Sequence, residues 1–159
     1  MSQFTHIDSE GHVRMVDVTD KGNTLREAVA RGVVTMRPAT QEKILAGTVK
    51  KGNVLETARI AGVMAAKKTS ALIPMCHPLN LTHIRVDFSP GKNASSIRIE
   101  ASVRLVGQTG VEMEALTAVA VAALTIYDMC KSYDREMTIS NIGLIKKSGG
   151  KSGQYIRKG

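Results

Sequence analysis

The chain has 159 residues and a formal net charge of +8, and aromatic residues make up only 3% of it. That length accommodates one domain with a substantial core, which must be built from aliphatic side chains and Met because there is no Trp. The charge indicates an anionic partner (a nucleic acid, a membrane surface or a phosphorylated small molecule), while the scarcity of aromatic rings argues against single-stranded nucleic acid.

The chain begins with a polar segment that has no apolar signal core. We expect residues 1–14 to be a flexible arm and residues 15–159 to form a single domain that ends in a basic tail. The short alternating segment MVDVT predicts a strand at 15–19, and the segment 26–36, which ends in VVTM, is predicted to form a second strand. The two cysteines are too few for a disulfide framework and fit a reducing compartment, so we expect a cytoplasmic protein.

Two helices are predicted next. Pro38 suits the first turn of a helix, and Gly47 suits the position after its last residue. Asn53 and Glu56 have the spacing of a capping box, which predicts a second helix that runs to about Lys67.

The middle of the chain carries the clearest strand pattern. Apolar residues alternate with polar ones over 84–88 and again over 97–105, on either side of a Pro-Gly turn, which predicts a hairpin. A long helix over 109–131 and a last strand over 137–145 follow. Because strands and helices are grouped, the pattern predicts an α+β domain whose antiparallel sheet is covered by helices.

The long helix is apolar between its two charged ends, and its apolar run is too short to cross a bilayer. Asp128 and Lys131 near its end are three residues apart, so they are either a surface ion pair or an acid–base pair that binds phosphate. Glu112 and Glu114 lie in the first turn, where the helix dipole stabilises acidic side chains. Alternatively, their carboxylates accept from the N–H groups of a purine-like ring.

Three further segments are candidates for ligand contacts. Cys76 and His77 lie between two prolines, which make their loop stiff, but further metal ligands at suitable spacing are missing. The basic, Gly-rich stretch around Lys147 and Lys151 fails the P-loop pattern, and is either a solvated tail or a loop that closes on phosphates. Lys51, just before a helix, is also placed to meet a phosphate.

Taken together, five segments resemble the MoaC family, the cyclic pyranopterin monophosphate synthases of molybdenum cofactor biosynthesis. They are MVDVT, KKGNVLETARIAG, LIPMCHPL, TGVEMEALTAVAVAALTIYDMCK and LIKKSGGKSG. The resemblance extends from about Met15 to Gly153, and its one visible departure is Met75 where the family is expected to have Leu.

The resemblance implies a ferredoxin-like protomer, assembled as a homohexamer of three dimers with active sites between subunits. It implies conversion of 3′,8-cyclo-7,8-dihydroguanosine 5′-triphosphate, supplied by a radical SAM enzyme, to cyclic pyranopterin monophosphate and diphosphate. The implied catalytic residues are Asp128, Lys51 and Lys131, and the implied substrate-binding residues are Met75, Cys76, His77, Glu112, Met113, Glu114 and Lys147.

This chemistry consists of proton transfers and charge stabilisation, so we expect no redox cofactor and no protein-bound metal, with Mg²⁺ left open as a companion of the triphosphate. We also expect neither a nucleic acid nor a membrane as partner. Two alternatives remain: a nucleic-acid-binding module, and a metal-dependent GTP cyclohydrolase-like enzyme with Cys76 and His77 as ligands. For the assembly, we expect Lys51 of one chain to meet Asp128 and Lys131 of its neighbour.

Overall fold

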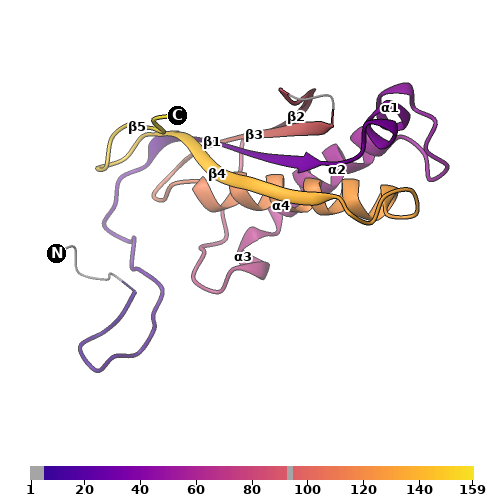
Figure 1. Cartoon of the computed structure of the whole chain (residues 1–159). Coiled ribbons are helices and arrows are strands. Elements are labelled where there is room, and N and C mark those ends of the chain that lie inside the picture. Colours follow the sequence, from indigo (N-terminus) through magenta and orange to yellow (C-terminus); the bar gives the residue numbers. More distant parts are fainter. Residues whose placement is uncertain (1–5, 93–94) are drawn as a thin grey trace.

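A computed structural model describes residues 6–92 and 95–159 (Figure 1). An antiparallel sheet with the strand order β2-β3-β1-β4-β5 lies against a layer of helices. The strands are β1 (Thr24–Thr35), β2 (His83–Pro90), β3 (Ser96–Gly107), β4 (Thr138–Ser148) and β5 (Tyr155–Ile156). The helices are α1 (Pro38–Ala46), α2 (Val54–Lys67), α3 (Thr69–Leu72) and α4 (Glu112–Cys130).

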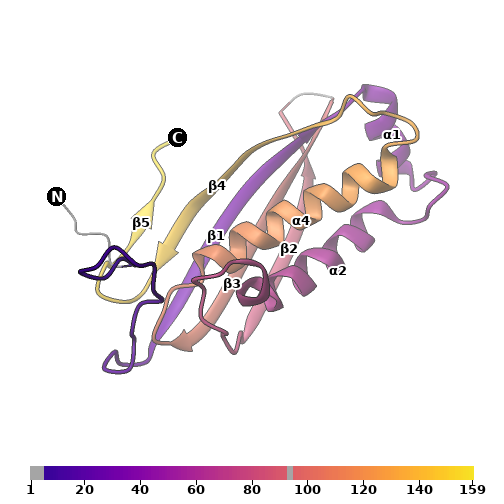
Figure 2. The same ribbon diagram turned by 90° about the horizontal axis from the view of Figure 1, so that it is seen from below.

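The path β1–α2–β2–β3–α4–β4, with β1 and β3 at the centre of the sheet, is the ferredoxin-like arrangement. The predicted α+β class and hairpin are therefore confirmed. Figure 2 shows α2 and α4 side by side across one face of the sheet, with α1 near the carboxyl end of α4. The other face has no helix over it among the described residues, so helices cover the sheet on one side.

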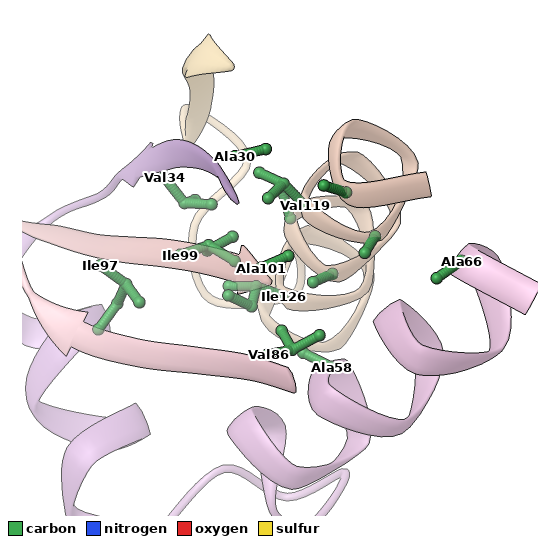
Figure 3. Packing of buried hydrophobic residues seen from close by; sticks show 14 of the residues in the cluster. Ala30, Val34, Ala58, Ala66, Val86, Ile97, Ile99, Ala101, Val119 and Ile126 are labelled. Carbon is green, nitrogen blue, oxygen red and sulfur yellow. The ribbon is translucent and has the colours of Figure 1, made fainter. Parts of the chain in front are cut away.

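The core is aliphatic, as the composition requires. Inward-facing residues of the strands, such as Ala30 and Ile99, meet Val119 and Ile126 of α4, all of them fully buried (Figure 3). The expectation that the apolar run of α4 is too short to cross a bilayer is wrong: the helix is long and apolar enough to do so by length and composition, but 56% of that stretch is buried inside the fold. Its apolar composition is thus explained by packing against the sheet and α2.

The helix boundaries follow the predicted signals. Gly47 ends α1 in the left-handed conformation, with φ of 69°. The Asn53 side chain accepts a hydrogen bond from the backbone N–H of Glu56 at 3.1 Å, which caps α2. The carboxylate of Glu56 lies beside Arg59 (3.1 Å), so it takes part in an ion pair on the helix surface.

The strand predicted at 15–19 is wrong, because this segment forms turns and coil. Asp17 accepts hydrogen bonds from both the backbone N–H and the hydroxyl of Thr19, and this local turn competes with a strand ladder. The Val16 carbonyl accepts from the His77 ring (2.8 Å), not from a neighbouring strand. The segment thus packs against the loop that carries His77.

The C-terminal region contains one strand that the sequence pattern did not reveal. Three glycines with positive φ, Gly149, Gly150 and Gly153, reverse the chain after β4. The short strand β5 then pairs with β4 in antiparallel register, Lys146 opposite Ile156. The Gly-rich stretch is therefore a turn between two strands, which keeps Lys147 on the sheet.

Gly32 in β1 sets how closely the sheet approaches α4. A Cβ there would lie 2.7 Å from Cγ1 of the buried Val119 and 3.1 Å from Cγ1 of Ile142. We therefore expect Gly32→Ala to lower the free energy of unfolding by about 1–3 kcal/mol, as overpacking does.

Urea unfolding followed by circular dichroism measures this effect. Gly22→Ala is the matched control, since nothing lies within 4 Å of a Cβ at that position. Equal unfolding midpoints for the two variants would show that the approach of β1 to α4 tolerates a methyl group.

Candidate functional site

At the carboxyl end of α4, three charged groups form what we call the lysine–aspartate cluster: Lys51, Asp128 and Lys131. Lys131 Nζ lies 2.7 Å from Asp128 Oδ1. Lys51 Nζ donates to the Asp128 carbonyl oxygen at 2.9 Å and lies 3.5 Å from Oδ2. Because Lys51 comes from the loop between α1 and α2, the cluster is more than a local pair within one helix.

All three side chains of the cluster are about half exposed. The hydrogen bond and charge of Lys131, together with the charge of Lys51, lower the pKa of Asp128. Asp128 is therefore a carboxylate at neutral pH, and the cluster carries a net positive charge. Such an arrangement attracts phosphate oxygens and holds ammonium groups next to a carboxylate base.

The amino end of α4 borders a cavity of about 360 Å³, here called the amino-end cavity. Its lining includes every residue that the resemblance assigned to substrate binding: Met75, Cys76, His77, Glu112, Met113, Glu114 and Lys147. The segment 75–77 follows α3, and Lys147 comes from β4. A loop, the first turn of α4 and a strand thus bring these side chains together.

Glu114 is the buried acid of this cavity, with 4% of its surface exposed. Burial, reinforced by the neighbouring carboxylate of Glu112, raises the pKa of Glu114 to about 7. Burial and the charge of Glu114 also raise the pKa of the Cys76 thiol. Glu114 can therefore hold or release a proton near neutral pH, while Cys76 stays a neutral thiol.

One hydrogen bond defines the tautomer of His77. Its Nε2 lies 2.8 Å from the Val16 carbonyl, and because a carbonyl only accepts, Nε2 carries the proton. The ring is thereby tethered to the segment before β1. The metal-ligand interpretation of Cys76 and His77 needs further ligands, and no cluster of three metal-binding side chains occurs in residues 6–92 and 95–159.

The rim of the cavity is basic, and two of its cations were missed by the sequence analysis. Lys147 Nζ lies 3.5 Å from Glu112 and also contacts Ser152. Lys21 and Arg26 line this cavity and an adjoining one of about 570 Å³, which extends to Gly150 and Lys151. The guanidinium of Arg26 donates to the carbonyls of Gly107 and Gln108, which fixes it beside the start of α4.

No local motif singled out Lys21 and Arg26. They come from the turn before β1 and from β1 itself, and they reach the cavity because β1 lies between β3 and β4 in the sheet. The positive charge of the whole chain was the only signal for them.

Within one chain, the amino-end cavity and the lysine–aspartate cluster lie far apart. Glu112 and Asp128 are sixteen positions apart in one continuous helix, which corresponds to about 24 Å at the helical rise per residue. A ligand seated in the cavity thus does not reach the cluster of its own chain.

The expected division of the cluster between two chains is wrong. Lys51 of one chain already contacts Asp128 of the same chain, since the α1–α2 loop packs against the end of α4. Within one chain, it is the lysine–aspartate cluster and the amino-end cavity that lie apart.

Many of the remaining cations lie on the open face of the sheet, where they are paired. Arg31 lies 2.6 Å from Glu100, and Arg104 lies 2.6 Å from Glu27. These pairs lower the free positive charge of that face, whereas a nucleic-acid-binding module presents a patch of unpaired cations.

The raised pKa of Glu114 predicts how stability depends on pH. Between about pH 4.5 and 7 the folded protein holds this proton while the unfolded chain loses it, so this group lowers stability as pH rises. Gln stays neutral, so we expect Glu114→Gln to be more stable than the natural chain by about 1–3 kcal/mol at pH 8, with the difference shrinking towards pH 5.

Urea unfolding of both proteins at these two pH values measures the difference. A stability difference that does not change with pH would show that Glu114 titrates in the folded protein as it does in the unfolded chain.

The comparisons with known proteins identify the family of this chain. The family model described as the MoaC family matches residues 15–150. The curated cyclic pyranopterin monophosphate synthase of Desulfatibacillum aliphaticivorans is 62% identical over 159 residues, which cover 100% of both chains. The proteins of the same name from Desulforapulum autotrophicum and Pelotomaculum thermopropionicum are 64% and 63% identical, over 98% and 100% of this chain and 96% and 94% of theirs. The chain belongs to the MoaC family.

Proposed function

We propose that this chain converts 3′,8-cyclo-7,8-dihydroguanosine 5′-triphosphate to cyclic pyranopterin monophosphate and diphosphate, a step of molybdenum cofactor biosynthesis. One observation carries the proposal: the amino-end cavity gathers all seven predicted substrate-binding residues, in a chain that is 62% identical over its whole length to a synthase of this name.

The chemistry of the cavity fits a guanine-derived ring with phosphates attached. The carboxyl groups of Glu112 and Glu114 are acceptors for ring N–H groups, and Glu114 exchanges a proton near neutral pH. The cations at the rim, Lys21, Arg26 and Lys147, suit a triphosphate that leaves the cavity towards the turn at Gly150.

The lysine–aspartate cluster supplies what the cavity lacks. The reaction opens and recloses a ring, and a ribose hydroxyl then attacks the inner phosphorus as the bond to the diphosphate breaks. Asp128 is a carboxylate beside two ammonium groups, so the cluster provides a base together with charge that stabilises the departing diphosphate. In our proposal Lys51, Asp128 and Lys131 are the catalytic residues.

We propose that a complete active site forms between two protomers. The cavity and the cluster of one chain are about 24 Å apart along α4, so a second chain must bring its cluster to the cavity of the first. A homohexamer of three dimers provides such interfaces. In this division one chain supplies Lys51, Asp128 and Lys131 together.

A radical SAM enzyme supplies the substrate, no redox cofactor takes part, and Mg²⁺ accompanies the triphosphate if it is used at all. The free Cys76 and Cys130 suit a reducing cytoplasm.

The function is tested by incubating the protein with the cyclised dihydroguanosine triphosphate and analysing the products by mass spectrometry. We expect equal amounts of cyclic pyranopterin monophosphate and diphosphate. Lys51→Ala, Asp128→Ala and Lys131→Ala should each lower turnover by about 100-fold or more while the unfolding midpoint stays unchanged, because these side chains are exposed. Substrate that returns unaltered from the natural protein contradicts the proposal.

The shared site makes a further prediction about mixtures of inactive variants. Asp128→Ala keeps an intact cavity, and the double variant His77→Ala/Lys147→Ala keeps an intact cluster. After subunit exchange at equal amounts, roughly a quarter of the two-chain sites should contain both intact halves, since each half is intact in one chain of two. Turnover should recover to about that fraction.

The matched control is a mixture of Lys51→Ala with Asp128→Ala. Both substitutions damage the same cluster within one chain, so no mixed site regains all three groups and turnover should stay low. Recovery in this control, or its absence in the first mixture after exchange is confirmed by native mass spectrometry, would contradict the division.

A further inference from the structure

We propose that Tyr133 is a positioning residue that fixes Lys51 against Asp128, and that the buried Asp134 holds Tyr133 in place. Only the expected effect on turnover rests on the proposed function, since the contacts of Tyr133 and Asp134 do not depend on it. Neither residue belongs to the cavity or to the lysine–aspartate cluster, and both lie in the turn that follows α4.

Asp134 is anchored on the amino end of α1. Its side chain is 2% exposed, and its Oδ2 accepts from the backbone N–H of Arg37 at 2.8 Å and from the hydroxyl of Thr40 at 3.2 Å. Arg37 is the residue that precedes α1, and its own side chain provides no cap. Asp134 therefore caps α1 from a distant part of the chain.

The same turn is closed by further bonds. Asp134 Oδ1 accepts from the backbone N–H of Glu136 at 3.2 Å, and the Arg37 guanidinium donates to the Tyr133 carbonyl. The backbone N–H groups of Tyr133 and Asp134 both donate to the Cys130 carbonyl, at 2.9 and 3.1 Å. The backbone at Tyr133 is thus fixed from both α1 and α4.

From this fixed backbone the Tyr133 side chain reaches the loop that carries Lys51. Its hydroxyl oxygen accepts a hydrogen bond from the backbone N–H of Lys50 at 3.1 Å. The Lys43 ammonium lies 5.2 Å from the centre of its ring, which holds the ring from the side of α1. The phenol group therefore ties the residue directly before Lys51 to the end of α4.

This bond matters because Lys51 is a long and half-exposed side chain. Its ammonium reaches Asp128 only if the backbone of its loop lies at the right distance from α4, and a small displacement of a catalytic group lowers a rate strongly. The buried Val49 side chain holds the start of the loop. The next residue, Lys50, is held by the hydrogen bond from its backbone N–H to the Tyr133 hydroxyl oxygen.

The test is Tyr133→Phe, which keeps the ring beneath Lys43 and removes only the hydroxyl. We expect kcat to fall on the order of ten-fold with KM within about two-fold, because the amino-end cavity lies at the other end of α4. Amide hydrogen exchange measured by mass spectrometry should become faster in peptides that cover residues 48–52 and stay unchanged in peptides that cover residues 108–116.

Tyr127→Phe is the matched control. It removes a phenol hydroxyl from the same end of α4, where that hydroxyl donates to the Arg135 carbonyl at 3.0 Å without touching the Lys51 loop. We expect this variant to keep the natural exchange at 48–52 and the natural kcat.

Unchanged exchange at 48–52 in Tyr133→Phe, or an unchanged kcat, would overturn the inference, as would an equal loss in both variants. A natural protein that forms no product while the two variants still differ in exchange would instead refute the proposed function and leave the anchoring of the loop established.

Discussion

The burial of α4 against the sheet is the constraint on which the rest of the structure depends. Ala and Val side chains along this helix, together with Gly32 in β1 and Gly62 in α2, let the backbones of three elements approach closely. The helix is continuous from Glu112 to Cys130, so it acts as a rigid spacer between its two ends. Both groups of functional residues are attached to this spacer: Glu112, Met113 and Glu114 at one end, and Asp128 and Lys131 at the other.

The two ends of α4 shift the pKa of a carboxyl group in opposite directions, and this difference gives them different tasks in our account. At the amino end Glu114 is buried, and this burial raises its pKa to about 7, while burial and the charge of Glu114 raise the pKa of the Cys76 thiol and keep it neutral. The carboxyl end is open to solvent, so the two ammonium groups beside Asp128 lower its pKa. In our proposal, a partly buried site that recognises the ring and an exposed cluster that stabilises the departing diphosphate are complementary parts of one reaction. Because a rigid helix separates them, we propose that a second chain brings them together, which makes assembly a condition for catalysis in this account.

Much of the fold could be predicted from the sequence because the patterns that specify its elements are local. The period-two alternation of the hairpin and the caps at Gly47 and Asn53 act over a few residues, and the structure confirms them. The segment 15–19 was misread because its alternation resembles a strand while Asp17 and Thr19 form a turn. Strand β5 was missed because its two residues gain their partners only after three glycines reverse the chain. The predicted site residues gather in two places, but Lys21, Arg26 and Tyr133 join them only through the sheet order and the packing of the α1–α2 loop, which no short motif encodes.

The central claim is that one substrate molecule is held by the cavity of one protomer and acted on by the cluster of another. A crystal structure of the Lys131→Ala protein with the cyclised dihydroguanosine triphosphate bound tests it most directly. The account predicts that the ring contacts Glu114 and His77 of one chain, and that Lys51 and Asp128 near the same molecule both belong to a neighbouring chain. A substrate that contacts Glu114 and Lys51 of a single chain would contradict it.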